Sequence, residues 1–107
     1  MDLEFLLSNY HMFCGEVKKY FDEDEWQVNS YKAKAHIIVL TSKRIFVYYF
    51  DSYIDMKYSK LSDSKISVST EDNAVTLTFL AQNLSFAITF LSCDDTSNFT
   101  RNFEKYN

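Results

Sequence analysis

Apolar residues in the first 21 positions recur at steps of three and four, the spacing of one face of an amphipathic helix. These positions are Leu3, Leu6, Leu7, Tyr10, Phe13, Cys14, Val17, Tyr20 and Phe21. Acidic residues stand near the start of this segment and Lys18–Lys19 near its end, an order that complements the helix dipole. The pattern predicts a helix over 1–21 with a broad apolar face, followed by a solvated acidic turn over 22–25.

From residue 25 to residue 91 the apolar period falls to two, which is typical of antiparallel strands with one buried face. Seven runs carry this pattern or a continuous apolar version of it: EWQVNSY, AHIIVL, RIFVYYF, YIDMKY, SKISVS, NAVTLTF and NLSFAITF. In the first run, Trp26, Val28 and Ser30 are expected on one face. The links between runs are too short for helical crossovers. Seven consecutive antiparallel strands are therefore expected over 25–91.

One of these runs, residues 45–50, lacks any polar alternation. In a strand, Ile45, Val47 and Tyr49 would share one face, and the opposite face would hold Phe46, Tyr48 and Phe50. A strand that is apolar on both sides must be covered on both sides. We expect one set inside the core of the strands and the other under the N-terminal helix or a second chain.

The last segment returns to helical spacing. Phe99, Phe103 and Tyr106 are separated by four and three residues and form one aromatic stripe. Ser92, Asp94 or Asp95 can cap the start of such a helix. The pattern predicts a C-terminal helix over 94–106 that closes one end of the strands, and thus a single domain over 1–107.

Composition narrows the class of protein. The 107 residues are 47% hydrophobic, which is enough for a packed core. No apolar run approaches a membrane span, and the N-terminus lacks the basic start of a signal peptide. The net charge of −4 and the dispersed basic residues argue against nucleic-acid binding. We therefore expect a cytoplasmic protein, and the proline-free, Asn-, Lys-, Tyr- and Phe-rich composition favours a bacterial or phage source.

Metal and cofactor signals are missing from the sequence. Cys14 and Cys93 fall in different predicted elements, with no CxxC pair or Cys/His cluster. Two buried free thiols are expected, and a disulfide between them is the alternative. The single glycine, Gly15, rules out a glycine-rich phosphate loop. Neither a metal nor a cofactor is predicted.

Three stretches of the chain carry local motifs of a known kind. The stretch VLTSKRIFVYYF, residues 39–50, with Thr41 and Arg44 at its polar positions, resembles the strand–turn–strand signature of the bacterial pleckstrin-homology-like (PH-like, GRAM-like) domain family. FDEDEWQV resembles the acidic element before the first strand and places Glu25 at the acidic position. Residues 54–67 resemble the short strand that follows. The glycines that the family usually has after its first strand are absent from KAKAHIIVLT.

The resemblance covers residues 22–106 and implies a mainly β (α+β) fold. That fold is a seven-stranded antiparallel, partly open barrel with a C-terminal capping helix, to which the N-terminal helix is an addition. We expect Arg44 to be structural, with its guanidinium paired to a turn carboxylate or a carbonyl.

A non-enzymatic protein-binding or adaptor function fits this fold, because a peptide can add as a strand at the open edge of the barrel. A modulator of a partner protein, encoded by a bacterium or a phage, is the specific hypothesis. The candidate protein-binding residues are Phe46, Tyr48, Phe50, Tyr53, Leu6 and Tyr10. We expect the N-terminal helix to cover the aromatic face within one chain, and a homodimer through that helix is the alternative.

Two other functions remain open at this stage. A phosphoinositide or anionic-lipid site would use Lys32 and Lys34 in the first hairpin, although two lysines and an acidic chain suit an anionic membrane poorly. A small enzyme would use His11 and Cys14, three residues apart on the first helix. No orienting carboxylate or oxyanion loop accompanies that pair, so no catalysis is expected.

Overall fold

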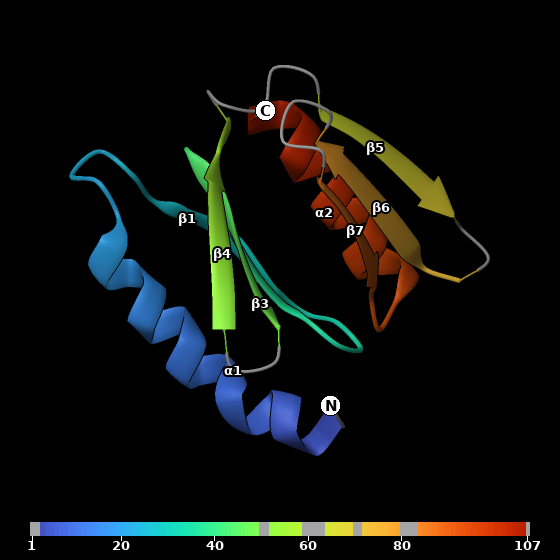
Figure 1. Ribbon diagram of the computed structural model, residues 1–107, viewed down its shortest axis with the longest axis horizontal. Helices are drawn as coiled ribbons and strands as arrows, with labels where there is room; N and C mark the ends of the chain where they lie inside the picture. Colours follow the sequence, from blue (N-terminus) through green and yellow to red (C-terminus); the bar gives the residue numbers. More distant parts are fainter. Residues whose placement is uncertain (1–2, 50–51, 59–63, 70–71, 80–83, 107) are drawn as a thin grey trace.

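The computed structural model describes residues 3–49, 52–58, 64–69, 72–79 and 84–106 (Figure 1). The helical elements are α1 (Leu3–Val17), the short 3-10 helix η1 (Lys18–Tyr20) and α2 (Cys93–Tyr106). The strands are β1 (Gln27–Lys32), β2 (Ile37–Thr41), β3 (Arg44–Tyr49), β4 (Ser52–Lys57), β5 (Ser64–Ser69), β6 (Ala74–Phe79) and β7 (Leu84–Thr89). In the described part of the chain they form two antiparallel sheets, ordered β1-β2-β3-β4 and β5-β6-β7. The predicted mainly β fold with a helix at each end is confirmed.

The two sheets touch at one corner, where β1 approaches the end of β7. Ala33 forms an isolated antiparallel bridge with Phe90, and the Lys34 N–H donates to the Thr89 carbonyl at 2.8 Å. Among the described residues, no ladder joins β4 to β5. The prediction of one partly open barrel is therefore corrected to a pair of sheets, because the described residues exchange backbone hydrogen bonds between the sheets only at this corner.

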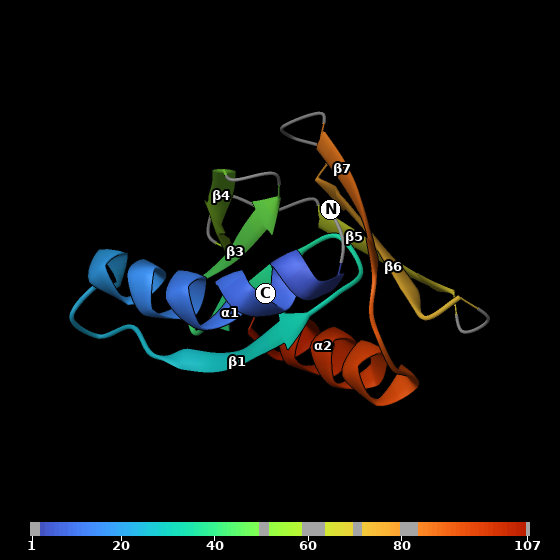
Figure 2. The same ribbon diagram turned by 90° about the horizontal axis from the view of Figure 1, so that it is seen from below.

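The first sheet lies between the two helices. Figure 2 shows α1 on one side of β1 and α2 on the other. On the α2 side, Phe99 and Phe103 are fully buried in a cluster that also takes residues from both sheets. The members of this inner cluster are Tyr31, Ala33, Ile38, Leu40, Ile45, Val47, Tyr58, Val75, Leu77, Ile88, Phe90, Phe99 and Phe103. The aromatic stripe of the C-terminal helix thus fills the space between the sheets.

A second, outer cluster lies between α1 and the first sheet. It contains Phe13, Val17, Ile37, Val39 and Phe46, with Tyr10, Cys14, Phe21 and Tyr48 packed against it. The two faces of β3 supply both clusters, Ile45 and Val47 the inner one and Phe46 the outer one. The prediction that this strand is covered on both sides, and on one of them by the N-terminal helix in the same chain, is confirmed for residues 45–47, whereas Tyr49 near the end of the strand is exposed. Phe50 lies outside the described residues.

The face predicted for the first strand is wrong. Trp26 packs edge-on against Tyr106 of α2, with ring centroids 6.4 Å apart, whereas the Ser30 hydroxyl hydrogen-bonds to Tyr10 of α1. The two residues therefore lie on opposite sides of the sheet. A register shift between Gln27 and Asn29 breaks the alternation, since a bulge reverses which side the following residues face.

The helix ends and the cysteines also differ in part from expectation. The first helix was predicted to extend to residue 21. In the structure α1 ends at Val17, and the short 3-10 helix η1 follows it up to Tyr20. Ser92 caps α2, because its Oγ accepts the Asp95 N–H at 3.1 Å.

Both cysteines are free, but only Cys14 is half-buried; Cys93 is exposed at the first position of α2. Neither described helix is long and apolar enough to cross a membrane.

Candidate functional site

Arg44 is the centre of a buried hydrogen-bond cluster at the β2–β3 turn. Its guanidinium binds Glu25 through two bonds, Nε to Oε2 at 2.9 Å and Nη2 to Oε1 at 2.8 Å. It also donates to Asp55 on β4 at 3.0 Å and to the Tyr20 carbonyl at 3.1 Å. The Thr41 hydroxyl donates to Glu25 and accepts the Arg44 N–H at 2.9 Å. The cluster ties the exit of α1 to three strands of the first sheet.

This geometry confirms the structural role expected for Arg44, and it corrects the expectation for the acidic turn. Glu25 was assigned to a solvated turn over 22–25, but its side chain is fully buried. A buried carboxylate requires partners, and the two-pronged guanidinium supplies them. Burial by itself raises the pKa of Glu25, but the hydrogen bonds from Arg44 and Thr41 outweigh it and hold the pKa below its ordinary value of 4.5.

The lowered pKa of Glu25 predicts a loss of stability in acid. A carboxyl whose pKa is lower in the folded state stabilises the fold above its ordinary pKa, and this contribution disappears as the pH falls through the folded value. We expect Glu25→Gln to be less stable than the wild type near pH 7 but to lose less stability between about pH 5 and pH 3. Urea unfolding at each pH measures this, and parallel pH profiles for the two proteins would contradict it.

The edge of β4 that faces away from β3 presents backbone groups that no described residue pairs with. The Tyr58 N–H donates to the Lys43 carbonyl at 2.9 Å, so this pair belongs to the hydrogen-bonded set of the β3–β4 ladder. Bonded and non-bonded pairs alternate along an antiparallel ladder. The N–H and C=O groups of Tyr53, Asp55 and Lys57 therefore point away from β3, and no described residue pairs with them. A strand from another molecule could pair with this edge.

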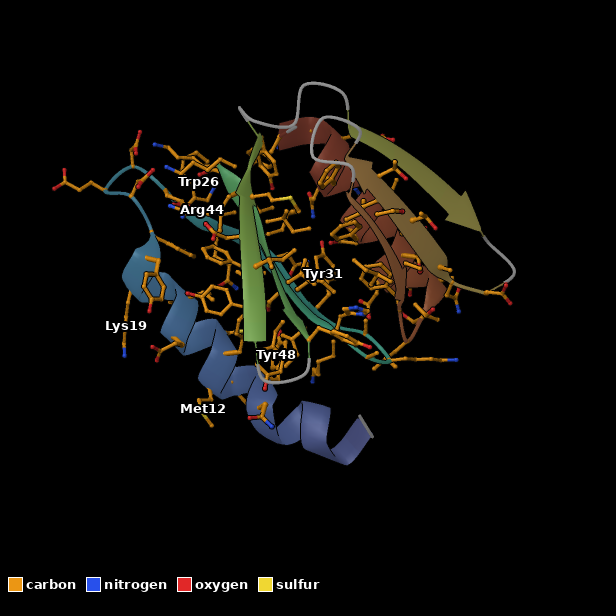
Figure 3. The ribbon with its side chains drawn as sticks, in the orientation of Figure 1. Met12, Lys19, Trp26, Tyr31, Arg44 and Tyr48 are labelled. Atoms are coloured by element: carbon orange, nitrogen blue, oxygen red, sulfur yellow. The ribbon has the colours of Figure 1, made fainter. Side chains whose placement is uncertain are left out.

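A groove beside that edge separates α1 from β4. It has a volume of about 190 Å³ and is lined by Asn9, Met12, Phe13, Glu16, Tyr48 and Tyr53. Met12 points away from the sheet into solvent and is 67% exposed (Figure 3), and Tyr53 is 38% exposed. The Phe13 ring contacts the Tyr48 and Tyr53 rings at centroid distances of 5.0 and 5.8 Å. The groove thus combines Met12 and aromatic side chains with Asn9 and Glu16 from α1, next to the outward-facing backbone of β4.

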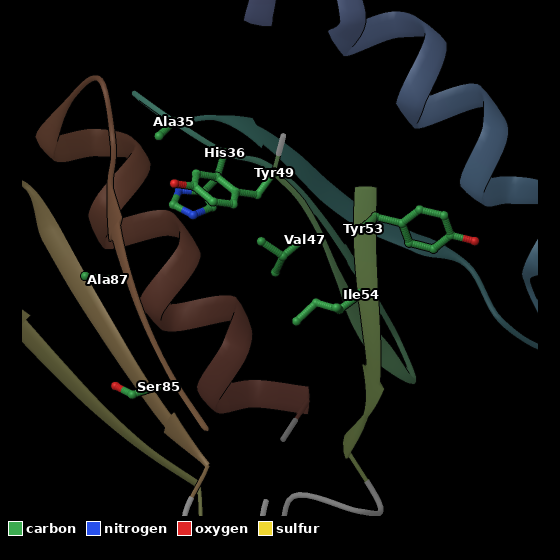
Figure 4. Close-up of a pocket in the computed structure, with 8 residues that line it drawn as sticks. All are labelled: Ala35, His36, Val47, Tyr49, Tyr53, Ile54, Ser85 and Ala87. Atoms are coloured by element: carbon green, nitrogen blue, oxygen red, sulfur yellow. The ribbon is translucent and has the colours of Figure 1, made fainter. Parts of the chain in front are cut away.

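A larger pocket lies on the other face of the first sheet, between that sheet and β7. Its volume is about 410 Å³, and its described lining is Ala35, His36, Val47, Tyr49, Tyr53, Ile54, Ser85 and Ala87. We call it the inter-sheet pocket. In Figure 4, Val47 and Ile54 point into it from β3 and β4, whereas the Tyr53 side chain points away toward α1.

The structure distributes the six predicted protein-binding residues unevenly. Tyr48 and Tyr53 line the groove between α1 and β4. Phe46 is buried beneath α1, and Tyr10 is half-buried on the same side, so neither adds much exposed surface. The Leu6 side chain and Phe50 lie outside the described residues. Sequence reasoning missed Met12, which falls off the apolar stripe of α1, and Ile54, which it treated only as part of an alternating strand.

The residues of the two alternative functions lie in surroundings that favour neither function. The Lys32 ammonium lies 4.8 Å from the centre of the Tyr10 ring, on the α1 side of the sheet, and Lys34 is exposed in the β1–β2 turn. The His11 ring is exposed and packs edge-on against Tyr10, while burial raises the pKa of the Cys14 thiol and so disfavours a reactive thiolate. Within the described part of the chain, no group of His, Cys, Asp and Glu side chains could hold a metal ion.

The arrangement of the two sheets and α2 is a PH-like fold. The chain is similar to the crystal structure of a pleckstrin homology domain from Shewanella amazonensis SB2B, with a TM-score of 0.66 over 91% of this chain and 96% of that one. The two sequences are 16% identical, so the likeness shows the fold alone. No protein-family model matches this sequence, and no curated protein matches it either. The predicted PH-like resemblance is confirmed at the level of the fold.

Proposed function

We propose that this chain is a non-enzymatic, cytoplasmic protein-binding module that receives an extended segment of its partner as a strand beside β4. The observation that carries the proposal is the outward-facing backbone of Tyr53, Asp55 and Lys57. Exposed strand edges are usually protected, since they pair readily with other chains. An edge that lies beside an apolar groove instead offers a peptide both main-chain hydrogen bonds and a place for its side chains.

The groove between α1 and β4 supplies the second half of the interaction. Side chains on one face of the added strand would rest on Met12, Tyr53 and the Phe13 ring. Aromatic residues and methionine are favoured in the cores of protein interfaces, because they bury much apolar area per side chain. A bacterial or phage protein that modulates a partner by masking such a segment is the specific role we assign to the module.

Proline substitution along β4 tests the proposal. At position 55 the N–H faces outward, so Asp55→Pro should leave the β3–β4 ladder intact while blocking an added strand. Asp55→Ala is the matched control, since it also loses the ion pair to Arg44 but keeps the N–H. We expect peptides selected from a displayed random library to bind the wild type and Asp55→Ala similarly, and Asp55→Pro at least about tenfold more weakly.

Two further measurements show whether Asp55→Pro acts on peptide binding and not on folding or self-association. Ile54→Pro removes an N–H that bonds to β3, so it should destabilise the fold where Asp55→Pro does not. Sedimentation at rising concentration shows whether a second copy of the chain occupies the edge, in which case a dimer would form in the wild type and not in Asp55→Pro. Selected peptides that bind all three position-55 proteins equally would exclude strand addition at β4.

A further inference from the structure

The inter-sheet pocket has a planar aromatic wall. The rings of His36 and Tyr49 stack with centroids 4.9 Å apart and an interplanar angle of 20°. Figure 4 shows this stacked pair at one side of the pocket, with Val47 and Ile54 beside it and β7 opposite. Val47 is almost fully buried and forms part of the inner cluster, so the pocket reaches the core between the sheets. A flat apolar ring would meet both an aromatic surface and an aliphatic one here.

None of the described lining residues carries a charge. Burial lowers the pKa of His36, which keeps its imidazole neutral near pH 7. The nearest lysines in sequence do not serve the pocket, because Lys32 lies over Tyr10 on the opposite side of the first sheet. Lys34 is not among the lining residues. A phosphate or carboxylate in this space would lose its hydration without gaining a fixed cation, so an uncharged ligand is the complementary one.

Polar groups reach the pocket from the edge of β7. The Phe90 N–H donates to the Asn73 carbonyl at 2.9 Å, which fixes the hydrogen-bonded set of the β6–β7 ladder. By alternation, the backbone groups of Ser85, Ala87 and Thr89 point away from β6. The Thr89 carbonyl accepts the Lys34 N–H, whereas the backbone groups of Ser85 and Ala87 have no partner among the described residues. Both residues line the pocket.

We propose that the inter-sheet pocket binds a small, uncharged, planar aromatic molecule with a hydrogen-bonding group on its rim. Its volume of about 410 Å³ lies within the range of small-molecule sites, and such sites combine apolar walls with a few polar groups that orient the ligand. The ring of the ligand stacks beside the His36–Tyr49 pair, and the group on its rim bonds to the outward-facing backbone of Ser85 or Ala87. This site is separate from the groove beside α1, so it goes beyond the proposed protein binding.

Indole is a suitable probe, because it is flat and uncharged and carries one N–H donor. We expect indole to bind with a Kd of about 1 mM or tighter in a nitrogen-15 NMR titration, with the largest shifts at the amides of Ala35, His36 and Ala87. Indene has the same shape without the donor, and it should bind several-fold more weakly. Indole-3-acetate and inorganic phosphate, both anionic, should bind at least about tenfold more weakly than indole.

Variants that change the pocket test whether indole binds there and not elsewhere on the protein. Ile54→Trp enlarges a side chain that points into the pocket and should weaken indole binding at least about tenfold. Thr76→Trp is its control, because it adds the same ring on β6 at a residue that does not line the pocket. If Ile54→Trp fails to fold, Tyr49→Ala removes the stacked wall and should have the same effect. Indole binding that survives both variants, or phosphate binding as tight as indole binding, would overturn the proposal. Asp55→Pro should leave indole binding unchanged, which separates this test from that of strand addition.

Discussion

Arg44→Ala should lower the free energy of unfolding by about 3–5 kcal/mol, because it leaves a fully buried carboxylate without its partner. The Arg44 side chain is 7% exposed, and its guanidinium makes two bonds to Glu25 and one each to Asp55 and the Tyr20 carbonyl. Losing them would also release the end of α1 from the sheet. Urea unfolding followed by circular dichroism measures the effect.

Two companion variants define what Arg44 contributes. Arg44→Lys keeps the charge but loses the planar guanidinium that binds Glu25 through two bonds. We therefore expect it to lower the free energy of unfolding, but by less than Arg44→Ala does. Lys43→Ala, at the neighbouring position, breaks only pairs with Asp22 and Asp24 at the surface and should leave the free energy of unfolding almost unchanged. An Arg44→Ala protein that is as stable as the Lys43→Ala protein would show that the buried cluster does not hold the fold together.

Phe46→Ala should destabilise the chain by about 3–5 kcal/mol, the usual cost of removing a fully buried phenylalanine. Phe46 is 1% exposed and lies in the outer cluster, stacked on Phe21 with ring centroids 5.9 Å apart. The resulting cavity would lie directly beneath α1, so amide hydrogen exchange in residues 9–17 should speed up more than exchange in α2. Thermal unfolding and exchange together test both the size and the place of the effect.

Trp26→Ala is the control for Phe46→Ala. It also removes a large ring, from the residue just before β1, but Trp26 is 56% exposed. Its loss should therefore cost much less than that of Phe46, because little of its surface leaves water on folding. If the two variants were equally stable, α1 would not cover the outer face of β3 in solution.

Much of the fold could be predicted because the decisive signals are local. The doubly apolar run 45–50 required two covered faces, and residues 45–47 have both. The bulge after Trp26 had no local signal, since the register of β1 is set by its pairing with β2 and by α2. The burial of Glu25 was missed for a similar reason: its partner Arg44 stands 19 residues away, and DEDE alone has the composition of a surface turn.

The candidate sites, too, could be predicted only where their residues are neighbours in sequence or share a strand. The aromatic residues of β3 and β4 were recognised, and Tyr48 and Tyr53 do line the groove beside α1. The inter-sheet pocket was not predicted, because it depends on where β7 lies relative to β3 and β4. Ser85 and Ala87 look in sequence like the plain solvent side of an amphipathic strand. Only the arrangement of the two sheets brings them near His36 and Tyr49.

The outer cluster also constrains how this sequence can change over evolutionary time. Ile37, Val39 and Phe46 give the first sheet an apolar outer face that is useful only while α1 covers it. A lineage that lost α1 would expose this face and would aggregate unless those positions had first become polar. Polar residues at those positions would in turn weaken α1 docking. The helix and the outer face should therefore be inherited as one unit, and descendants of this chain should keep both or lack both.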